Sequence, residues 1–170
     1  MKHLFFAFLA ILFFAGCHTE RSTADLPAVR NFDAGRYCGV WYEIARLPHS
    51  FQKGMTQVKA TYTLRDDGTL SVRNEGVKNG KAESIDGVAR FKGEKDVGEL
   101  EVSFFRPFYG DYKIIALDEN YTLAVVTSST RAYFWILSRT PSIAESLRSE
   151  ILERARADGF DIGKIIFAEP

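Results

Sequence analysis

Histidine is the residue of this chain best suited to acid–base or metal chemistry, and it is scarce. Of three histidines, only His49 lies in the part of the sequence that has the pattern of a folded domain. Around it we find no serine and aspartate in the order of a hydrolase triad, no paired metal ligands and no glycine-rich phosphate loop. We therefore expect a binding protein that needs no metal or cofactor, rather than an enzyme.

Four charged residues could instead serve a ligand. Glu43 is expected to face the interior of the domain, where it would either meet a ligand or be satisfied by neighbouring groups. Lys53, Arg106 and Arg131 would either bind an acidic headgroup or be ordinary surface charges.

The two cysteines predict different roles. A run of twelve apolar residues, Leu4 to Ala15, stops at Gly16-Cys17. The run is too short to span a bilayer and is typical of a signal peptide. If Cys17 is modified, Cys38 has no partner for a disulfide. We interpret Cys38 as a small packed strand residue rather than as a reactive thiol.

The sequence Ala15-Gly16-Cys17 resembles the lipobox of bacterial lipoproteins, although position 14 is Phe where that pattern most often has Leu. The resemblance implies that residues 1–16 are removed as a signal peptide and that Cys17 is lipidated and anchors the protein to a membrane. By the same resemblance, His18 in place of Asp implies sorting to the outer membrane. An ordinary secretory signal peptide is the alternative.

The mature chain then divides into two parts. Residues 17–30 are expected to be the lipidated N-terminus and a flexible spacer, because they are mostly polar and have no periodicity. Residues 31–170 have the size of one domain. Removal of residues 1–16 leaves 21 basic against 22 acidic residues, so no basic field suited to a nucleic acid remains.

Alternating apolar and polar residues predict eight β-strands separated by short turns such as Asn79-Gly80, with no helix between them. Eight such strands can close into a small barrel that holds one ligand. We therefore predict an all-β fold, an eight-stranded antiparallel up-and-down barrel. The expected strands cover about 40–46, 58–65, 70–78, 82–91, 99–104, 112–117, 121–127 and 132–138.

The pattern changes to helical spacing after the last of these strands, with Ile143, Leu147, Ile151 and Ala155 on one face. It predicts a helix of about 142–158 that packs on the outside of the barrel. The helix would begin with Pro141 in its first turn or with a capping box from Ser142 to Glu145. A short ninth strand is expected at 161–167.

Gly39 and Trp41 begin the first expected strand, Asp118 follows the sixth, and Arg139 ends the eighth. These motifs, in this order, resemble those of the lipocalins, over about residues 31–168. A narrower resemblance, to the bacterial lipocalins of the outer membrane, is carried by the strings Gly39–Arg46, Ser103–Gly110 and Trp135–Pro141.

Alternating strand directions place Gly39, Trp41, Asp118 and Arg139 at the same end of the barrel, which we call the floor. The resemblance implies that Arg139 lies across the Trp41 ring and closes this end, in a cation–π contact worth about 0.5–2 kcal/mol. The alternative is that Arg139 is a solvated strand end. The opposite end is the mouth.

Side-chain alternation counted back from Arg139 turns Leu137, Trp135 and Tyr133 into the barrel. Phe108 and Tyr109 are expected on a loop at the mouth, as an entrance for an apolar guest. The expected ligand-binding residues are Tyr62, Phe104, Phe108, Tyr109, Tyr133, Trp135 and Leu137.

The resemblance implies that the barrel binds fatty acids or lysophospholipids, for lipid storage, transport or maintenance of the cell envelope. The protein would be anchored by lipid to a bacterial outer membrane, with its domain in the periplasm. Two other functions stay open, namely a lipid-modifying enzyme on this scaffold and an interaction module that displays the barrel loops. Whether the chain is a monomer or a homodimer also stays open.

Overall fold

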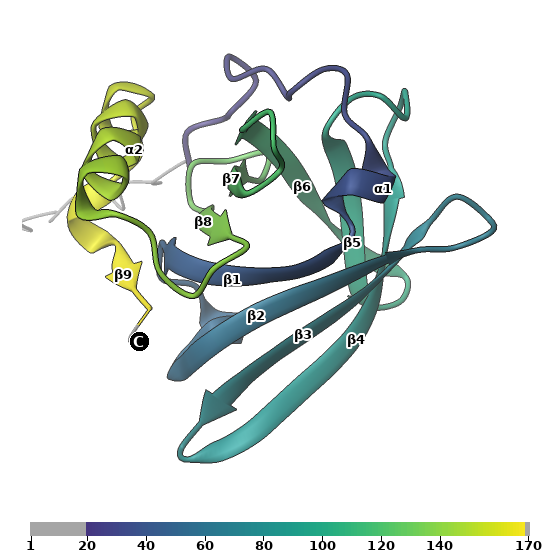
Figure 1. Ribbon diagram of the computed structural model, residues 1–170, viewed down its shortest axis with the longest axis horizontal. Helices are drawn as coiled ribbons and strands as arrows, with labels where there is room; N and C mark the ends of the chain where they lie inside the picture. Colours follow the sequence, from purple (N-terminus) through teal and green to yellow (C-terminus); the bar gives the residue numbers. More distant parts are fainter. Residues whose placement is uncertain (1–19, 169–170) are drawn as a thin grey trace, which may run out of the picture.

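The computed structural model describes residues 20–168, so the expected signal peptide and Cys17 lie outside the described residues. Nine strands form one sheet in the order β2-β3-β4-β5-β6-β7-β8-β1-β9 (Figure 1). Because β1 also pairs with β2, strands β1 to β8 close into an antiparallel barrel. The predicted eight-stranded up-and-down barrel is confirmed.

The elements follow the sequence pattern closely. The strands are β1 (Gly39–Arg46), β2 (Met55–Leu64), β3 (Leu70–Lys78), β4 (Lys81–Phe91), β5 (Glu99–Phe105), β6 (Phe108–Leu117), β7 (Leu123–Thr127), β8 (Phe134–Ser138) and β9 (Ile166–Phe167). The helices are α1 (Ala34–Tyr37) and α2 (Glu145–Ala157), and two 3-10 turns are η1 (Ser50–Gln52) and η2 (Ile162–Lys164). The expected loop of residues 106–110 is wrong, because β6 already begins at Phe108.

Two apolar clusters lie on the two faces of the barrel wall. The inner cluster includes Trp41, Tyr62, Val72, Leu100, Ile114, Val126 and Leu137. The outer cluster includes Ile44, Ala45, Val125, Phe134, Ile136, Ala155 and Phe160. Along β8 the side chains alternate, with Phe134 and Ile136 outside and Trp135 and Leu137 inside. The inward register predicted for Trp135 and Leu137 is therefore confirmed.

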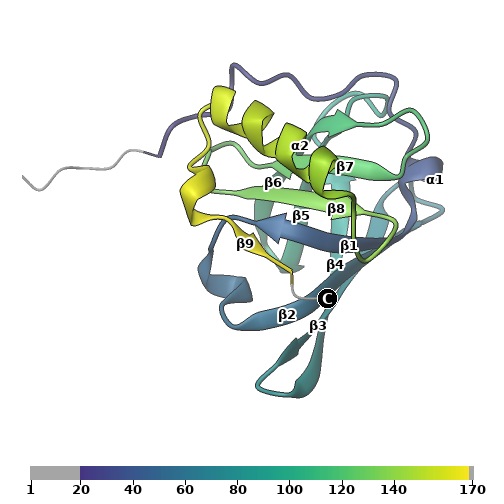
Figure 2. The same ribbon diagram turned by 60° about the vertical axis from the view of Figure 1, so that its left-hand side comes forward.

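Helix α2 lies against the outside of the barrel, as predicted (Figure 2). It begins at Glu145, after Pro141, and its N-cap Ala144 makes no side-chain hydrogen bond. The expected capping box from Ser142 and the expected place of Pro141 in the first turn are therefore both wrong. The chain then returns as β9, which pairs with the end of β1 at Ala45 and Arg46.

Residues 20–30 lie on the barrel, which differs from the flexible spacer expected for them. Thr23 is fully buried, and its backbone N–H donates to the carbonyl oxygen of Ser129 at 3.0 Å. Leu26 belongs to the outer cluster, and Arg30 forms a single β-bridge with Val97. Isolated bridges of this kind require no periodicity, so the sequence pattern could not indicate them.

Candidate functional site

The floor of the barrel is closed by Trp41 and Arg139. The guanidinium carbon of Arg139 lies 3.9 Å from the centroid of the Trp41 ring, so the expected cation–π contact is present. The guanidinium also donates hydrogen bonds of 2.8–3.1 Å to five backbone carbonyl oxygens, those of Arg36, Tyr37, Cys38, Val40 and Tyr121. Arg139 is thus a structural residue that ties three segments of the floor together.

Gly39 makes room for this arrangement. Its φ of +99° is a conformation that other L-residues rarely adopt. A Cβ atom at this position would lie 3.2 Å from the nearer guanidinium nitrogen of Arg139. The glycine before Trp41 is therefore required by both the backbone and the neighbouring side chain.

Asp118 lies at the floor, but its hydrogen bonds go to its own turn rather than to Trp41 or Arg139. Its carboxylate accepts hydrogen bonds of 2.6 Å from the backbone N–H groups of Thr122 and Leu123. Burial raises the pKa of this carboxyl, but the hydrogen bonds from Leu123 and Thr122 outweigh burial and hold the pKa below its ordinary value. Asp118 therefore shapes the turn that presents the Tyr121 carbonyl to Arg139.

Tyr62 points inward as expected, but it lies in the floor layer opposite Gly39. Its hydroxyl lies 2.9 Å from that of Tyr112, which lies 2.7 Å from that of Tyr37. Burial raises the pKa of Tyr62 to about 12. Its place at the bottom leaves it little surface for a ligand.

Above the floor, several inward-facing side chains keep some accessible surface. A set of inward-facing residues packs against the inner cluster and yet remains only half-buried. Protein interiors are normally close-packed, so an accessible side chain that points inward has free space beside it. These residues are Ala60, Val102, Phe104, Tyr112 and Trp135. Of the predicted ligand-binding residues, Phe104, Trp135 and the buried Leu137 therefore belong to the wall of the lumen.

A buried polar cluster interrupts this apolar wall on the mouth side of Trp41. The pairing of β1 with β8 shifts register between Glu43 and Ala45, so that Ile44 and Ala45 both lie on the outside. Arg46 is then paired with Trp135 and lies on the same inner side as Glu43. Both charged residues are almost fully buried.

Hydrogen bonds connect the members of this cluster. Arg46 donates to one carboxylate oxygen of Glu43, and Gln52 Nε2 donates to the other at 2.9 Å. The indole N–H of Trp135 donates to Gln52 Oε1 at 3.1 Å. Burial raises the pKa of Glu43, which the charge of Arg46 partly offsets. Of the two roles expected for Glu43, the structure supports the one in which neighbouring groups satisfy its carboxylate. The residue lies above the floor.

Some polar atoms of this region have no partner among the described residues. They are the buried Nε of Arg46 and both ring nitrogens of His49. Burial, and secondarily the charge of Arg46, lowers the pKa of His49 to about 4, so the imidazole is neutral at pH 7. The cluster thus holds one guanidinium N–H and an imidazole that have no partner among the described residues.

Aromatic rings close over this cluster at the mouth. His49 stacks on Phe51 with ring centroids 3.8 Å apart, and Tyr133 stacks on Trp135 at 5.9 Å. The structure thus brings Tyr133 and Trp135 together, as expected. Sequence reasoning missed Arg46 and Gln52, because simple alternation from Trp41 turns Arg46 outward.

Phe108 and Tyr109 do not form the expected common entrance. Because β6 begins at Phe108, the two side chains follow strand alternation and lie on opposite faces. Phe108 is exposed at the mouth, whereas Tyr109 lies outside, with its ring 4.1 Å from the Arg90 guanidinium carbon. The prediction that Tyr109 binds the ligand is therefore wrong.

Arg131 was expected either to bind an acidic headgroup or to be an ordinary surface charge. Its side chain is buried in contacts with the N-terminal segment, so neither role at the rim is confirmed.

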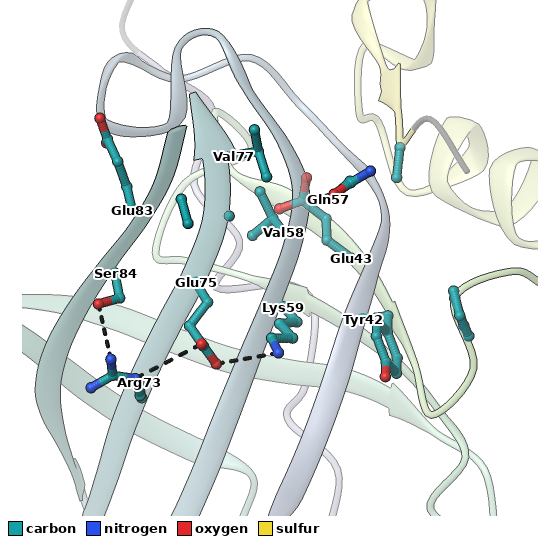
Figure 3. Close-up of a pocket in the computed structure, with 14 residues that line it drawn as sticks. Tyr42, Glu43, Gln57, Val58, Lys59, Arg73, Glu75, Val77, Glu83 and Ser84 are labelled. Atoms are coloured by element: carbon teal, nitrogen blue, oxygen red, sulfur yellow. Dashed lines mark hydrogen bonds and ion pairs between the residues drawn. The ribbon is translucent and has the colours of Figure 1, made fainter. Parts of the chain in front are cut away.

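A hollow of about 580 Å³ lies where β2 parts from β1, and Glu43 of the polar cluster lines it together with residues of β2, β3 and β4 (Figure 3). Its lining is mixed, with Val58, Val77 and Ala82 beside charged residues, of which Glu75 pairs with Lys59 at 3.5 Å and with Arg73 at 4.0 Å. We assign no ligand to this hollow.

Within residues 20–168, no group of three or more His, Cys, Asp or Glu could hold a metal ion. No helix there is both long and apolar enough to cross a membrane.

Comparisons with known proteins agree with this geometry. A family model described as a lipocalin-like domain matches residues 32–170. The outer membrane lipoprotein Blc of Escherichia coli (strain K12) is 45% identical over 165 residues, which cover 96% of this chain and 91% of that protein. The protein of the same name from Vibrio cholerae is 42% identical and covers 85% of this chain and 86% of its own length.

Among solved structures, insecticyanin from the tobacco hornworm Manduca sexta superposes with a TM-score of 0.72 at 21% identity. The match covers 89% of this chain and 87% of insecticyanin, and it supports the fold alone. From the family match, the identity to the bacterial proteins and the closed barrel, the chain belongs to the lipocalin-like family.

Proposed function

We propose that this protein is a lipid-anchored lipocalin that binds fatty acids or lysophospholipids in its barrel. The observation that carries this proposal is the lumen, in which half-buried apolar side chains lie between a closed floor and a buried polar cluster near the mouth. Such a site suits an amphipathic molecule with one acyl chain.

The two ends of the ligand would meet different surroundings. The acyl chain would contact Val102, Phe104 and Leu137, whose burial by a ligand is favourable at about 25 cal/mol per Å² of apolar surface. The polar end would lie near Arg46 and His49, whose free nitrogens can hydrogen-bond to a carboxylate or phosphate. The Glu43 carboxylate already compensates the charge of Arg46, so we expect hydrogen bonding rather than net charge to orient the polar end.

The proposed anchor and location rest on sequence. The relatives named as outer membrane lipoproteins support lipidation of Cys17 and attachment to a bacterial outer membrane, with the domain in the periplasm. Metabolic labelling with a clickable palmitate analogue should mark the wild type but not Cys17→Ser. Equal labelling of the two would contradict the anchor.

We further propose that the protein is not an enzyme and that it serves lipid storage, transport or maintenance. The Glu43 carboxylate of the lumen is held by Arg46 and Gln52, and no contact among the described residues favours a lipid-modifying enzyme or a loop-displaying module. Light scattering would decide between monomer and homodimer.

The test of ligand binding is to fill the lumen. Val102→Trp adds an indole inside the barrel, whereas Thr63→Trp adds one on the exposed outer face of β2. Co-purifying lipid, extracted and measured by mass spectrometry, should fall in Val102→Trp and persist in Thr63→Trp. Equal lipid content in two folded variants would refute a ligand in the lumen.

A further inference from the structure

The N-terminal segment is fixed at one end of the barrel. Ser22 forms a β-bridge with Thr130, and the backbone N–H of Arg131 donates to the carbonyl oxygen of Arg21 at 2.8 Å. These partners belong to the connection between β7 and β8. That connection lies at the mouth, because β8 runs from its pairing with Arg46 down to the floor.

Arg131 locks the segment there. Its side chain is buried and donates to both carboxylate oxygens of Asp25, at 2.7 and 2.8 Å. The same guanidinium donates to the carbonyl oxygens of Ser22 and of Asp158, at the end of α2. The guanidinium thus uses all three of its nitrogens, with Nη2 donating to Asp25, Nη1 to Ser22 and Nε to Asp158, so the segment is held on the fold rather than tethered loosely.

This attachment makes the connection to the proposed anchor short. Only three residue steps separate Cys17 from Glu20, which span at most about 11 Å. Had residues 17–30 been a free spacer, the domain could have turned either end to the membrane. Because residues 21–23 are fixed on the β7–β8 connection, the described chain begins at the mouth end of the barrel (Figure 2).

The mouth also carries the most exposed large apolar side chains of the described chain. Phe51, Phe105 and Phe108 are 58, 71 and 77% exposed. Phe51 lies in the connection from β1 to β2, and Phe105 and Phe108 flank the turn between β5 and β6. Aromatic side chains exposed together at one end of a molecule mark an interaction site, and they suit the interface of a bilayer.

The connections at the mouth and those at the floor also differ in charge. The four connections at the mouth, residues 47–54, 79–80, 106–107 and 128–133, contain no Asp or Glu. Basic side chains in them or at their edges are Lys53, Lys78, Lys81 and Arg106, besides the buried Arg131. In contrast, the floor connections 65–69, 92–98 and 118–122 contain six acidic and three basic residues. The N-terminal segment fixed at the mouth adds Arg21 together with Glu20 and Asp25, and Asp25 is paired with Arg131. An anionic surface would therefore attract the four mouth connections and repel those of the floor.

We propose that the mouth docks on the surface of an anionic lipid bilayer. The rim phenylalanines enter the interface, the rim cations contact the headgroups, and the locked N-terminal segment holds this orientation. A fatty acid or lysophospholipid can then pass between bilayer and lumen without crossing bulk water. The proposal rests on the proposed function for the anchor and for the ligand.

The test uses the lipidated protein on vesicles of phosphatidylcholine mixed with phosphatidylglycerol whose acyl chains carry bromine, which quenches nearby tryptophan. Phe108→Trp reports on the mouth, and Leu64→Trp, at an exposed position of the floor end, is its matched control. Subtracting the wild-type signal removes the contribution of Trp41 and Trp135. We expect loss of fluorescence from the tryptophan at position 108 and none from that at position 64.

Each outcome bears on one claim. Equal or stronger quenching at position 64, or no quenching at either position, would overturn the docking. In pure phosphatidylcholine the quenching at position 108 should weaken, and unchanged quenching would remove the cations from the proposal. Failure of the anchor shows separately, as loss of the wild type from the membrane fraction, and failure of ligand binding shows as absence of co-purifying lipid.

Discussion

Glu43 and Arg46 are three residues apart on β1, and both point into the barrel. A regular strand would place them on opposite faces, but the bulge at Ile44 and Ala45 adds one residue and restores the inward direction. The result is a buried ion pair completed by Gln52. Its partners depend on one another, because either charge alone would be buried without compensation.

Arg46→Met should therefore destabilise the fold strongly, by about 3–5 kcal/mol, since it leaves the Glu43 carboxylate buried and unpaired. The double variant Glu43→Gln with Arg46→Met should recover much of this loss, because no charge remains. Urea unfolding followed by circular dichroism measures both. The single variant Glu43→Gln completes the cycle. If the double variant loses as much stability as the two single variants together, the pair is not coupled in the way the structure indicates.

His49 should make stability depend on pH on the acidic side. Its pKa is lowered from 6.5 to about 4 in the folded protein, so its neutral form favours folding above pH 6.5 and this contribution is lost as the pH falls toward 4. The shift corresponds to at most about 3 kcal/mol, and we expect about 1 kcal/mol because the imidazole is partly exposed.

His49→Phe keeps the ring stack but does not titrate, so its melting temperature should fall less than that of the wild type between neutral pH and about pH 4. Glu43 acts in the opposite direction, because its raised pKa makes protonation favourable to the folded state, and it is present in both proteins. Parallel curves for the two proteins would show that His49 is not shifted.

The floor predicts a coupled pair. Trp41→Ala and Arg139→Ala should each destabilise, and the double variant should lose less than their sum by about 0.5–2 kcal/mol, the value of the shared cation–π contact. Trp41→Ala with Arg73→Ala is the control, since Arg73 lies on the outer face with Asp86, and its effects should add. Full additivity for Trp41 and Arg139 would deny their contact.

The sequence predicts the strands from the alternation of apolar and polar residues. It predicts the floor from the order of the strands along the chain. Alternation identifies a strand such as β5, and Gly39, Trp41 and Arg139 lie near strand ends whose direction follows from the meander. The bulge at Ala45 was not predictable, since two successive small or apolar residues read equally well as a regular strand. The docking of Thr23 and Asp25 was missed because their partners, Ser128 and Arg131, lie more than 100 residues away in sequence.

Release of Arg131 should loosen the N-terminal segment and the end of α2, to which the same guanidinium donates. In Arg131→Ala the amides of residues 21–26 lose their anchoring guanidinium, so hydrogen exchange there should quicken while the inner strands stay protected. Arg156→Ala, which removes an exposed pair with Glu153 on α2, is the matched control and should change little. Unchanged exchange at residues 21–26 in Arg131→Ala would show that the bridges to Thr130 suffice.

Trp135 should report on ligand in the lumen. Its indole is half-buried, lies in the inner wall and donates to Gln52, so an acyl chain or headgroup entering the lumen changes its surroundings. Trp41 is fully buried under Arg139 and should respond little. Titration of Trp41→Phe with a long-chain fatty acid should therefore retain most of the wild-type fluorescence change. In Trp135→Phe the change should nearly vanish, with affinity weakened only modestly, because one aromatic ring replaces another. A response that survives in Trp135→Phe and disappears in Trp41→Phe would place the ligand away from the polar cluster and remove the lumen site proposed here.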